Sequence, residues 1–419
     1  MRRGALAALC LLAPAPAAAP CRLRDRAALF ELYDNLNGAN WTTNTNWHRG
    51  NDPCFMVERY YGVGKEDPCQ RWYDGPTCTA GRISAIFLSD NNLAGALNWS
   101  AVGELTNLTI LDLSWNSISG TLPGELGLIR NLQVLDLSHN MISGTLPPEL
   151  GAINTGLELV RTGRPAETNQ LKELRLSHNA LSGVIPPEIA ALTGLFSVDV
   201  RSNPLQGTIP PQLTALTSLQ SLFFGQSNVS GTLPANMTDA VPAAPPLLPE
   251  PTGLRALAHL DGGAANLSGT LPPSISGMGE LLRLSLARNA LSGSLPPELF
   301  GATVLRDVYL EGNLISGSIP SDVGKLRSVE TIDVFDNPLG GDIPPEIEAC
   351  TNLKYLYVPK ETLRPIRQRY CRQRLPDPGK YNWRVVRDDY SQMTQLECED
   401  MHDTAFTFST LQDSGVYET

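Results

Sequence analysis

The chain has 419 residues, of which 42% are hydrophobic, and a formal net charge of -11 at pH 7. This apolar content is too high for a disordered chain, and the acidic balance disfavours nucleic acid as a partner, because phosphate binding needs clustered Lys and Arg. The 36 glycines and 33 prolines indicate a fold that turns often and regularly.

The first residues have the pattern of a secretory signal peptide, which we place at 1–19. A basic end at Arg2 and Arg3 precedes an apolar run over 5–13 and an A-x-A cleavage site at 15–17. That run is too short to span a bilayer, and no later stretch has 18 consecutive apolar residues. The polar end TLQDSGVYET also lacks the hydrophobic tail of a lipid-anchor signal. We therefore expect a secreted, extracellular protein without a direct membrane span.

Sequons and cysteines agree with export. Six N-x-S/T sequons begin at Asn40, Asn98, Asn107, Asn228, Asn236 and Asn266. After removal of the signal, seven cysteines remain: Cys21, Cys54, Cys69, Cys78, Cys350, Cys371 and Cys398. In an oxidising compartment most of them should pair, and the odd number leaves at least one without a partner in the chain.

The segment 20–82 comes before the first repeat and is expected to close that end of the fold. Asp25 can cap a helix whose Leu29, Leu32 and Leu36 face the first repeat. A repeat array needs such a segment, because its end face would otherwise expose apolar residues.

An internal repeat fills residues 83–360 and decides the architecture. The eleven repeats start at Ile83, Leu108, Leu132, Leu171, Leu195, Leu219, Leu257, Leu281, Leu305, Val329 and Leu353. Most intervals are 24 residues, whereas those from Leu132 and Leu219 exceed this by 15 and 14. We place the two insertions near 151–170 and 234–253.

Each repeat begins with L-x-x-L-x-L, in which alternating apolar residues share one face of a short strand. An Asn follows, then Gly and Pro turn the chain before another Leu points inward. One repeat cannot bury its apolar face alone, so stacked repeats should form a parallel sheet over a continuous core.

The Asn should lie buried at the turn and bind backbone groups of the next coil. The positions are Asn91, Asn116, Asn140, Asn179, Asn203, Ser227, Ala265, Asn289, Asn313 and Asn337. Because the series is interrupted at Ser227 and Ala265, beside the Pro-rich insertion, we predict a loosened joint there.

The unit LxxLxLSxNxLSGxLPPEL resembles the plant-type leucine-rich repeat of receptor-kinase ectodomains, receptor-like proteins and polygalacturonase-inhibiting proteins. The segments DRAALFELYDNLNGANWTTNTNW (25–47) and DPCQRWYDGPTC (67–78) resemble the N-terminal cap of such proteins. The resemblance implies an α/β solenoid: a right-handed horseshoe or superhelix with a concave parallel β-sheet, an N-terminal helical cap and a C-terminal cysteine cap over 361–419.

Within that family frame, we expect disulfides that join Cys21 to Cys54, Cys69 to Cys78, and Cys371 to Cys398. A zinc site is disfavoured because the chain has no CxxC motif. Cys350 precedes a strand and should be a lone buried thiol. The basic run at 364–374 is either a binding patch or, more simply, a solvated cap surface.

No Walker loop, G-x-S-x-G, HExxH or kinase motif set is present, so the sequence indicates neither an enzyme nor a cofactor. Binding through the concave face is the expected function, with the third, fifth, seventh and eighth positions of each repeat exposed. The first candidate group is Trp115, His139 and His178 with Asp112, Asp136 and Arg175. The second is Phe223, Tyr309, Phe335 and Tyr357. An exposed Trp115 either binds a ligand or is covered by a neighbouring side chain or a glycan on Asn107.

His139 and His178 occupy the same position in adjacent repeats and should be neighbours, since parallel strands lie about 4.8 Å apart. Three interpretations stay open: an ordinary exposed repeat position, a pH-sensitive contact, or a metal site, which the nearby Arg175 disfavours.

The leading interpretation is a recognition module, similar to a receptor ectodomain without its kinase, that binds a peptide, glycan or extracellular protein and signals through a membrane co-receptor. The alternatives are an inhibitor of an extracellular cell-wall-degrading hydrolase and a structural matrix protein. The fifth- and eighth-position residues vary between repeats, unlike a surface that matches a crystal lattice, which favours an irregular partner.

Overall fold

The computed structural model describes residues 23–43, 75–79, 82–129, 131–153, 171–238, 253–359 and 384–386. The predicted signal peptide lies outside these residues, and so does at least one cysteine of each predicted disulfide. The chain divides into two compact units, the first ending at Ser221 and the second beginning at Leu222, apart from a short segment of the second insertion. The domain boundaries that we derived from the sequence stay predictions.

The main sheet of the first unit is built from the strands of successive repeats. Its strands are β1 (Gly75–Thr79), β2 (Arg82–Phe87), β4 (Ile110–Asp112), β6 (Val134–Asp136), β8 (Glu173–Arg175) and β10 (Ser197–Asp199). They follow the order β1-β2-β4-β6-β8-β10, with β1 antiparallel to β2 and every later pair parallel.

The second unit repeats this arrangement. Its main strands are β12 (Ser221–Phe223), β14 (His259–Asp261), β16 (Arg283–Ser285), β18 (Asp307–Tyr309), β20 (Thr331–Asp333), β21 (Tyr355–Tyr357) and β22 (Arg384–Val386), in that order. From β14 onward the strands are parallel. Each of the eleven predicted repeats supplies one strand to the main sheet, from β2 in the first repeat to β21 in the last. The α/β solenoid with a parallel sheet is therefore confirmed in each unit.

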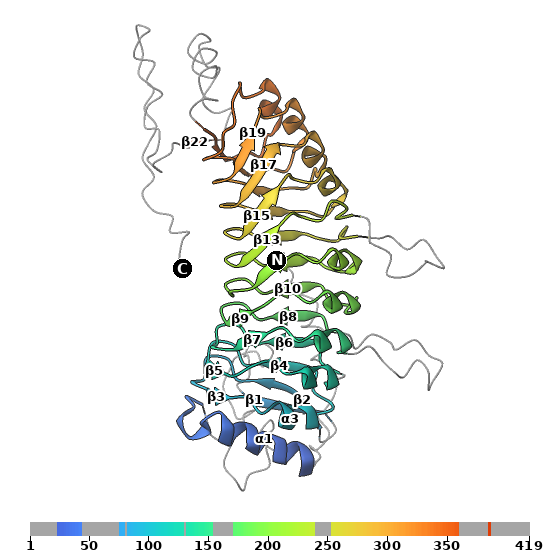
Figure 1. The fold of residues 1–419 in the computed structure, drawn as a ribbon, viewed down its shortest axis with the longest axis vertical. Coiled ribbons are helices and arrows are strands. Elements are labelled where there is room, and N and C mark those ends of the chain that lie inside the picture. Colours follow the sequence, from blue (N-terminus) through green and yellow to red (C-terminus); the bar gives the residue numbers. More distant parts are fainter. Residues whose placement is uncertain are drawn as a thin grey trace, which may run out of the picture. The chain divides into compact units, whose positions relative to one another are not determined.

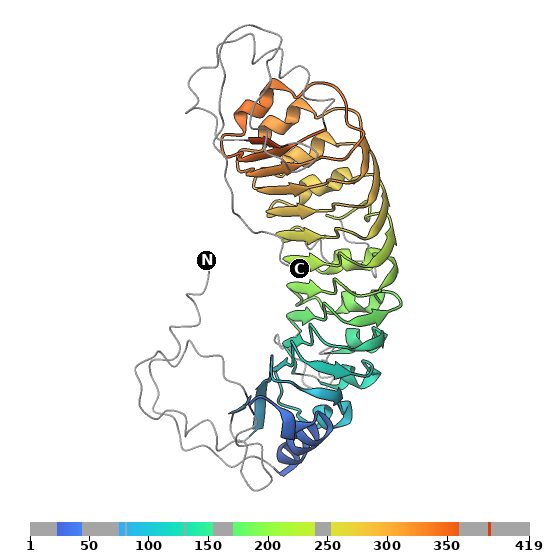
Figure 2. The ribbon, with the colours of Figure 1, turned by 90° about the vertical axis from the view of Figure 1, so that its left-hand side faces the viewer.

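Short helices lie on the side of the coils opposite the main sheet (Figure 1, Figure 2). They are α3 (Trp99–Glu104), η4 (Gly124–Leu128), η5 (Pro148–Ala152), η6 (Pro187–Ala191), η7 (Pro211–Ala215), η8 (Pro273–Gly277), η9 (Pro297–Gly301), η10 (Ser321–Lys325) and η11 (Pro345–Ala349). Proline opens most of the 3-10 helices, because its fixed φ suits a first helical turn that needs no N–H donor.

A second set of strands follows each Asn turn. These strands are β3 (Ala94–Ala96), β5 (Ser117–Ser119), β7 (Ser143–Thr145), β9 (Ala180–Ser182), β11 (Gln206–Thr208), β13 (Asn228–Gly231), β15 (Asn266–Gly269), β17 (Ala290–Ser294) and β19 (Leu314–Ser316). They form the pairs β3-β5 and β7-β9 in the first unit and the order β13-β15-β17-β19 in the second. We call these the lateral strands.

The core lies between these elements and consists of the repeated leucines, most of which are fully buried, such as Leu111, Leu135 and Leu174. The Asn side chains close each coil. Asn313 Nδ2 donates to the carbonyl oxygens of Leu286 (3.0 Å) and Leu310 (2.9 Å), and its Oδ1 accepts from the Leu291 amide (3.0 Å). The partner coil is therefore the preceding one, not the next one that we expected.

At one of the two interrupted Asn positions, a serine hydrogen-bonds within its own turn. Ser227 Oγ donates to the Phe224 carbonyl at 2.7 Å and accepts from the Val229 amide at 3.3 Å. The same repeat places Phe224, fully buried, where other repeats have Leu or Val, and the next repeat has Gly262 at that position. A Cβ on Gly262 would lie 2.3 Å from Phe224 Cζ, so the glycine makes room for the ring.

The N-terminal helix α1 (Leu23–Asn35) packs beside α3. Leu29, Leu32 and Leu36 are fully buried, in agreement with the predicted apolar face. The prediction that Asp25 caps this helix is wrong, because Asp25 lies inside its first turn. Its buried carboxylate instead pairs with Arg82 Nε (2.9 Å) and accepts from the Ile83 amide (2.9 Å), which ties the helix to β2.

η2 (Gly38–Asn40) follows α1 and leads to Trp41, whose indole N–H donates to the Leu36 carbonyl at 2.7 Å. At the other end of the described repeats, Cys350 is a buried free thiol that donates to the Val323 carbonyl at 3.2 Å, as predicted. Burial raises the pKa of this thiol to about 11, which disfavours the reactive thiolate form.

Candidate functional site

The fifth-position residues of the first unit lie side by side on the main sheet, as the repeat register predicts. Phe87 pairs with Asp112, Asp112 with Asp136, Asp136 with Arg175, and Arg175 with Asp199. Because parallel neighbours in register point to the same face, residues up to 112 positions apart in sequence form one continuous row.

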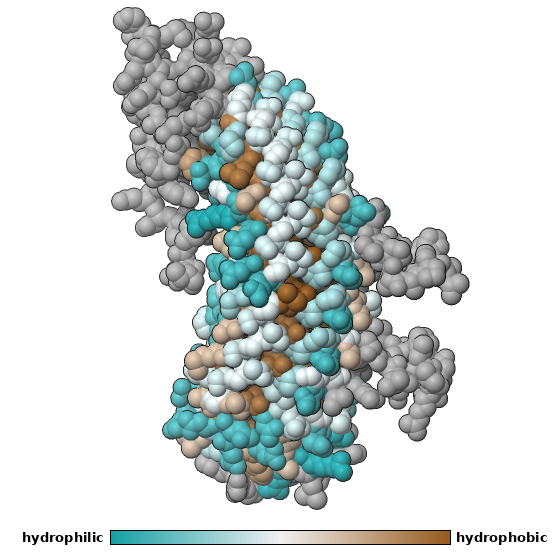
Figure 3. Space-filling view, in the orientation of Figure 1, coloured by the Kyte–Doolittle hydropathy of each residue, from teal (hydrophilic) through white to brown (hydrophobic). Residues whose placement is uncertain are grey.

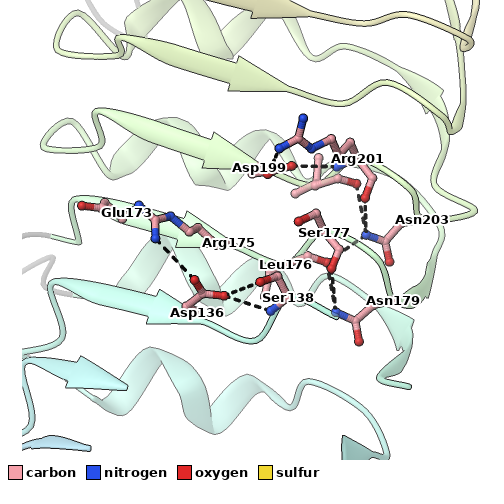
Figure 4. Close-up of polar contacts among 11 residues, drawn as sticks. Asp136, Ser138, Glu173, Arg175, Leu176, Ser177, Asn179, Asp199, Arg201 and Asn203 are labelled. Atoms are coloured by element: carbon pink, nitrogen blue, oxygen red, sulfur yellow. Dashed lines mark hydrogen bonds and ion pairs between the residues drawn. The ribbon is translucent and has the colours of Figure 1, made fainter. Parts of the chain in front are cut away.

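Part of this row is less accessible than expected. Asp136 is 7% and Asp199 is 8% exposed, and the seventh-position serines Ser114, Ser138 and Ser177 are buried as well. The expectation that fifth and seventh positions are exposed is wrong here. The reason is local: Ser138 donates to the Asp136 carboxylate from its hydroxyl (2.6 Å) and its amide (3.0 Å), which folds the aspartate against the turn (Figure 4).

Two arginines complete the polar row. Arg175 Nη1 lies 3.4 Å from Asp136 Oδ2 and also pairs with Glu173, while Arg201 Nη2 lies 3.0 Å from Asp199 Oδ2 (Figure 4). Arg175 remains exposed, so its guanidinium can still meet a ligand. Asp112 differs from these aspartates, since within the described residues it takes part in no ion pair and accepts only from the Ser114 hydroxyl (2.7 Å) and amide (3.1 Å).

The three aromatic residues of the first group stack in one column. Trp115, His139 and His178 follow β4, β6 and β8, and each has a left-handed backbone with φ of 55–56°. The Trp115 and His139 ring centroids are 3.6 Å apart and the His139 and His178 centroids 4.1 Å, both with an interplanar angle of 13°. We call these three residues the ring column. Its first ring, Trp115, remains 60% exposed.

Burial and neighbouring charges shift the pKa values of both histidines in the column. Partial burial, the neighbouring His178 and Arg201 lower the pKa of His139, against the opposing effect of Asp136 and Asp199. Burial and Arg201 lower the pKa of His178 in the same way. Stacked neutral imidazoles fit these shifts, because a proton on one ring disfavours a proton on the other.

The second candidate group is not a continuous aromatic surface. Phe223, Tyr309, Phe335 and Tyr357 all lie half-buried on the second unit. In the sheet register, Asp333 lies between Tyr309 and Tyr357. Arg283 packs over the Tyr309 ring at 4.9 Å, and Tyr355 stacks on Tyr357. Sequence reasoning missed both Asp333 and Tyr355 because it selected aromatic residues from a few positions only.

Asp333 forms an acidic centre with Glu311. Burial, and then the charge of Glu311, raise the pKa of Asp333 to about 7. Burial also raises the pKa of Glu311, whose buried Oε2 has no hydrogen-bond partner among the described residues. Within the described residues, no group of three or more His, Cys, Asp or Glu could hold a metal ion, either here or at the histidines.

The lateral strands carry a second, more regular surface. Serine hydroxyls donate to the glycine carbonyl of the preceding coil, as from Ser143 to Gly120 and from Ser292 to Gly269, both at 3.2 Å. Two residues after each serine, or after Gln206 in one coil, an exposed side chain recurs: Thr121, Thr145, Val184 and Thr208 in the first unit, and Thr232, Thr270, Ser294 and Ser318 in the second. We call this the lateral threonine row. The face with these strands carries mostly residues of near-neutral hydropathy (Figure 3).

The six sequons differ in accessibility. Asn40, Asn228, Asn236 and Asn266 are exposed, and Asn98 and Asn107 are half-buried. The Asn98 side-chain oxygen caps α3 by accepting from the Ser100 and Ala101 amides. A glycan on Asn98 would have to leave these two hydrogen bonds in place. Glycosylation itself stays a prediction. None of the described helices is long and apolar enough to cross a membrane.

Comparison with known proteins identifies the repeat. Two leucine-rich-repeat family models match residues 82–142 and 170–192. An inactive leucine-rich repeat receptor-like serine/threonine-protein kinase of Arabidopsis thaliana is 33% identical over 110 residues, 26% of this chain and 14% of that protein. The match therefore spans a small part of that relative.

Solved structures similar to the chain include two peptide-bound receptors. The plant peptide hormone receptor RGFR1 in complex with RGF2 is 28% identical with a TM-score of 0.58, over 72% of this chain and 43% of that one. The Arabidopsis receptor kinase HAESA ectodomain in complex with an IDA peptide hormone is 25% identical with a TM-score of 0.60, over 80% and 49%. A plant ice-binding protein is 25% identical with a TM-score of 0.57, over 78% and 90%. The chain thus spans under half the length of the two receptors.

Proposed function

We propose that this plant-type leucine-rich-repeat protein is an extracellular recognition module that binds a peptide through the main-sheet face of its first unit. The observation that carries the proposal is the ring column. Its rings are held parallel by adjacent coils, and Trp115 keeps most of its surface open. A rigid exposed Trp loses little entropy on binding, and Trp and Arg are the residues most often found at binding hot spots.

The polar row beside the ring column supplies specificity. Arg175 offers a guanidinium that can pair with a carboxylate, and Asp112 offers a carboxylate without an ion pair among the described residues. A peptide provides such alternating charge together with apolar side chains. The two receptor structures, whose bound ligands are peptide hormones, support the same ligand class.

In this proposal the protein is not an enzyme, it acts outside the cell or at its surface, and any signal passes through a membrane co-receptor. A glycan or a folded extracellular protein remains the alternative ligand. Inhibition of a cell-wall-degrading hydrolase and a structural matrix role also stay alternatives, and no feature of the sheet face favours them.

Peptide capture tests the proposal. The purified chain is incubated with peptides from secreted fractions, and bound peptides are identified by mass spectrometry. We expect Trp115→Ala to reduce capture by about tenfold or more, as for a hot-spot residue, and Arg175→Ala to reduce it for acidic peptides. Tyr355→Ala, at an exposed aromatic of the second unit, is the matched control. Capture that is unchanged in Trp115→Ala would contradict the proposal.

The lateral threonine row favours a second candidate, binding to ice. A side chain with a hydroxyl group, a methyl group or both recurs once per coil, about 4.8 Å apart, which suits an ordered water lattice. The similar plant ice-binding protein supports this candidate. It predicts that the chain inhibits ice recrystallisation and that Thr145→Lys with Thr208→Lys abolishes the effect, whereas Trp115→Ala does not. A wild-type chain without the effect would rule it out.

A further inference from the structure

We infer that the open face of the Trp115 indole, beside Asp90, is a subsite for a guanidinium group, so that the ligand presents an arginine there. This inference rests on the proposed function and deepens it. It starts from the fact that His139 covers only one face of the indole, at a centroid distance of 3.6 Å. The exposed fraction of 60% belongs to the remainder of the side chain, including the opposite face.

Backbone geometry places Asp90 at that opposite face. The Asp90 amide donates to the Ser114 carbonyl (3.0 Å), just as the Trp115 amide donates to Ser138 (2.9 Å) and the His139 amide to Ser177 (2.9 Å). Asp90 has the same left-handed backbone, with φ of 51°. Asp90 therefore occupies the same position relative to Trp115, one coil earlier, that Trp115 occupies relative to His139. Its side chain is too short to cover an indole ring.

The charges around the column favour a cation at this end. Asp136 and Asp199, nearer the other end, are already paired with Arg175 and Arg201. Asp90 is exposed, and within the described residues neither it nor Asp112 takes part in an ion pair. The two carboxylates that remain available to a ligand, Asp90 and Asp112, thus lie at the Trp115 end of the column.

A guanidinium matches both features. Its plane can stack on the electron-rich indole face while its N–H groups reach a carboxylate at the edge. An ammonium has the charge without the stacking plane, and a sugar can stack without the charge. These differences allow the three ligand classes to be told apart.

Fluorine NMR of the full chain labelled with 5-fluorotryptophan can test the subsite. The Trp115 signal is assigned as the one lost in Trp115→Phe, and the probes are N-acetyl-arginine amide, N-acetyl-lysine amide, N-acetyl-citrulline amide and glucose. We expect a saturable shift with the arginine probe and an affinity at least about threefold lower for citrulline, its neutral isostere. Asp90→Asn should weaken arginine binding by about two- to fivefold.

Asp336→Asn is the matched control, since Asp336 has the same left-handed turn position in the second unit. It should leave the Trp115 response unchanged. Equal affinities for arginine and citrulline, a stronger response to glucose, or no effect of Asp90→Asn would each overturn the inference. If peptide capture still depends on Trp115 in that case, the proposed function survives and only the arginine subsite fails.

Discussion

Asp333 is an ionisable residue whose pKa is strongly raised by its surroundings. Its carboxyl lies largely buried on the main sheet of the second unit, accepts from the Phe335 amide at 3.1 Å, and has Glu311 as an acidic neighbour. Both the burial and the like charge disfavour the ionised form, which raises the pKa to about 7. The folded state therefore holds a proton that the unfolded chain releases at lower pH.

This difference makes stability depend on pH. A carboxyl with a raised folded pKa contributes stability below its unfolded pKa, and the contribution is lost as pH rises through the folded value of about 7. Asp333→Asn mimics the protonated acid and does not ionise. We therefore expect its free energy of unfolding, compared with that of the natural chain, to be more favourable at pH 8 than at pH 5 by on the order of 2 kcal/mol.

Urea unfolding at both pH values measures this difference, with Asp342→Asn at an exposed carboxyl as the control. An Asp333→Asn variant whose gain over the natural chain is the same at both pH values would contradict the raised pKa.

At the scale of elements, a large side chain in the coil of β12 fills the space left by a glycine in the coil of β14. Phe224 follows β12 and Gly262 follows β14, at the position where most repeats have Leu. The Cβ of an alanine at Gly262 would lie 2.3 Å from Phe224 Cζ and 2.5 Å from Cε2. These ring atoms are ones that a leucine does not have.

A double-mutant cycle follows from this contact. We expect Gly262→Ala to lower the free energy of unfolding by about 1–3 kcal/mol through overpacking. In a Phe224→Leu background the same substitution should cost much less, because the clashing ring atoms are gone. Chemical denaturation of the four proteins gives the coupling energy. Additive effects would show that the ring and the glycine do not share one space.

At the scale of the whole molecule, the Asn series stabilises most coils but is interrupted within the second unit. The Leu267 and Leu291 amides donate to Asn289 and Asn313 at 3.0 Å, whereas the Val229 amide, in the part of the chain that the structure describes, donates only the longer bond to Ser227 Oγ. The division between the two compact units also falls in this repeat, between Ser221 and Leu222.

Hydrogen exchange should therefore reveal a weak point there. We expect the Val229 amide to exchange at least about tenfold faster than those of Leu267 and Leu291, since it lacks an Asn acceptor. NMR or mass spectrometry under native conditions can measure this. If the amides of repeats six and seven were as protected from exchange as those of the adjacent repeats, the prediction of a loosened joint would be wrong.

The sequence by itself determined what depends on repetition. Its period placed one strand in each repeat, and its register placed Asp112, Asp136 and Arg175 in one row and His139 beside His178. It could do so because residues at equivalent positions of stacked coils must be neighbours. The Phe224 and Gly262 pair was also visible in the sequence, as a large and a small residue where Leu is the rule.

Only the tertiary structure decided how each side chain meets its neighbours. It buried Asp136 and Asp199 against their turns, left Asp112 without an ion pair among the described residues, and bound Asp25 to Arg82 rather than to a helix end. It also stacked the indole and imidazoles face to face and left Trp115 60% exposed. Side-chain rotamers and desolvation set these outcomes, and both depend on atoms from several coils that no single repeat contains.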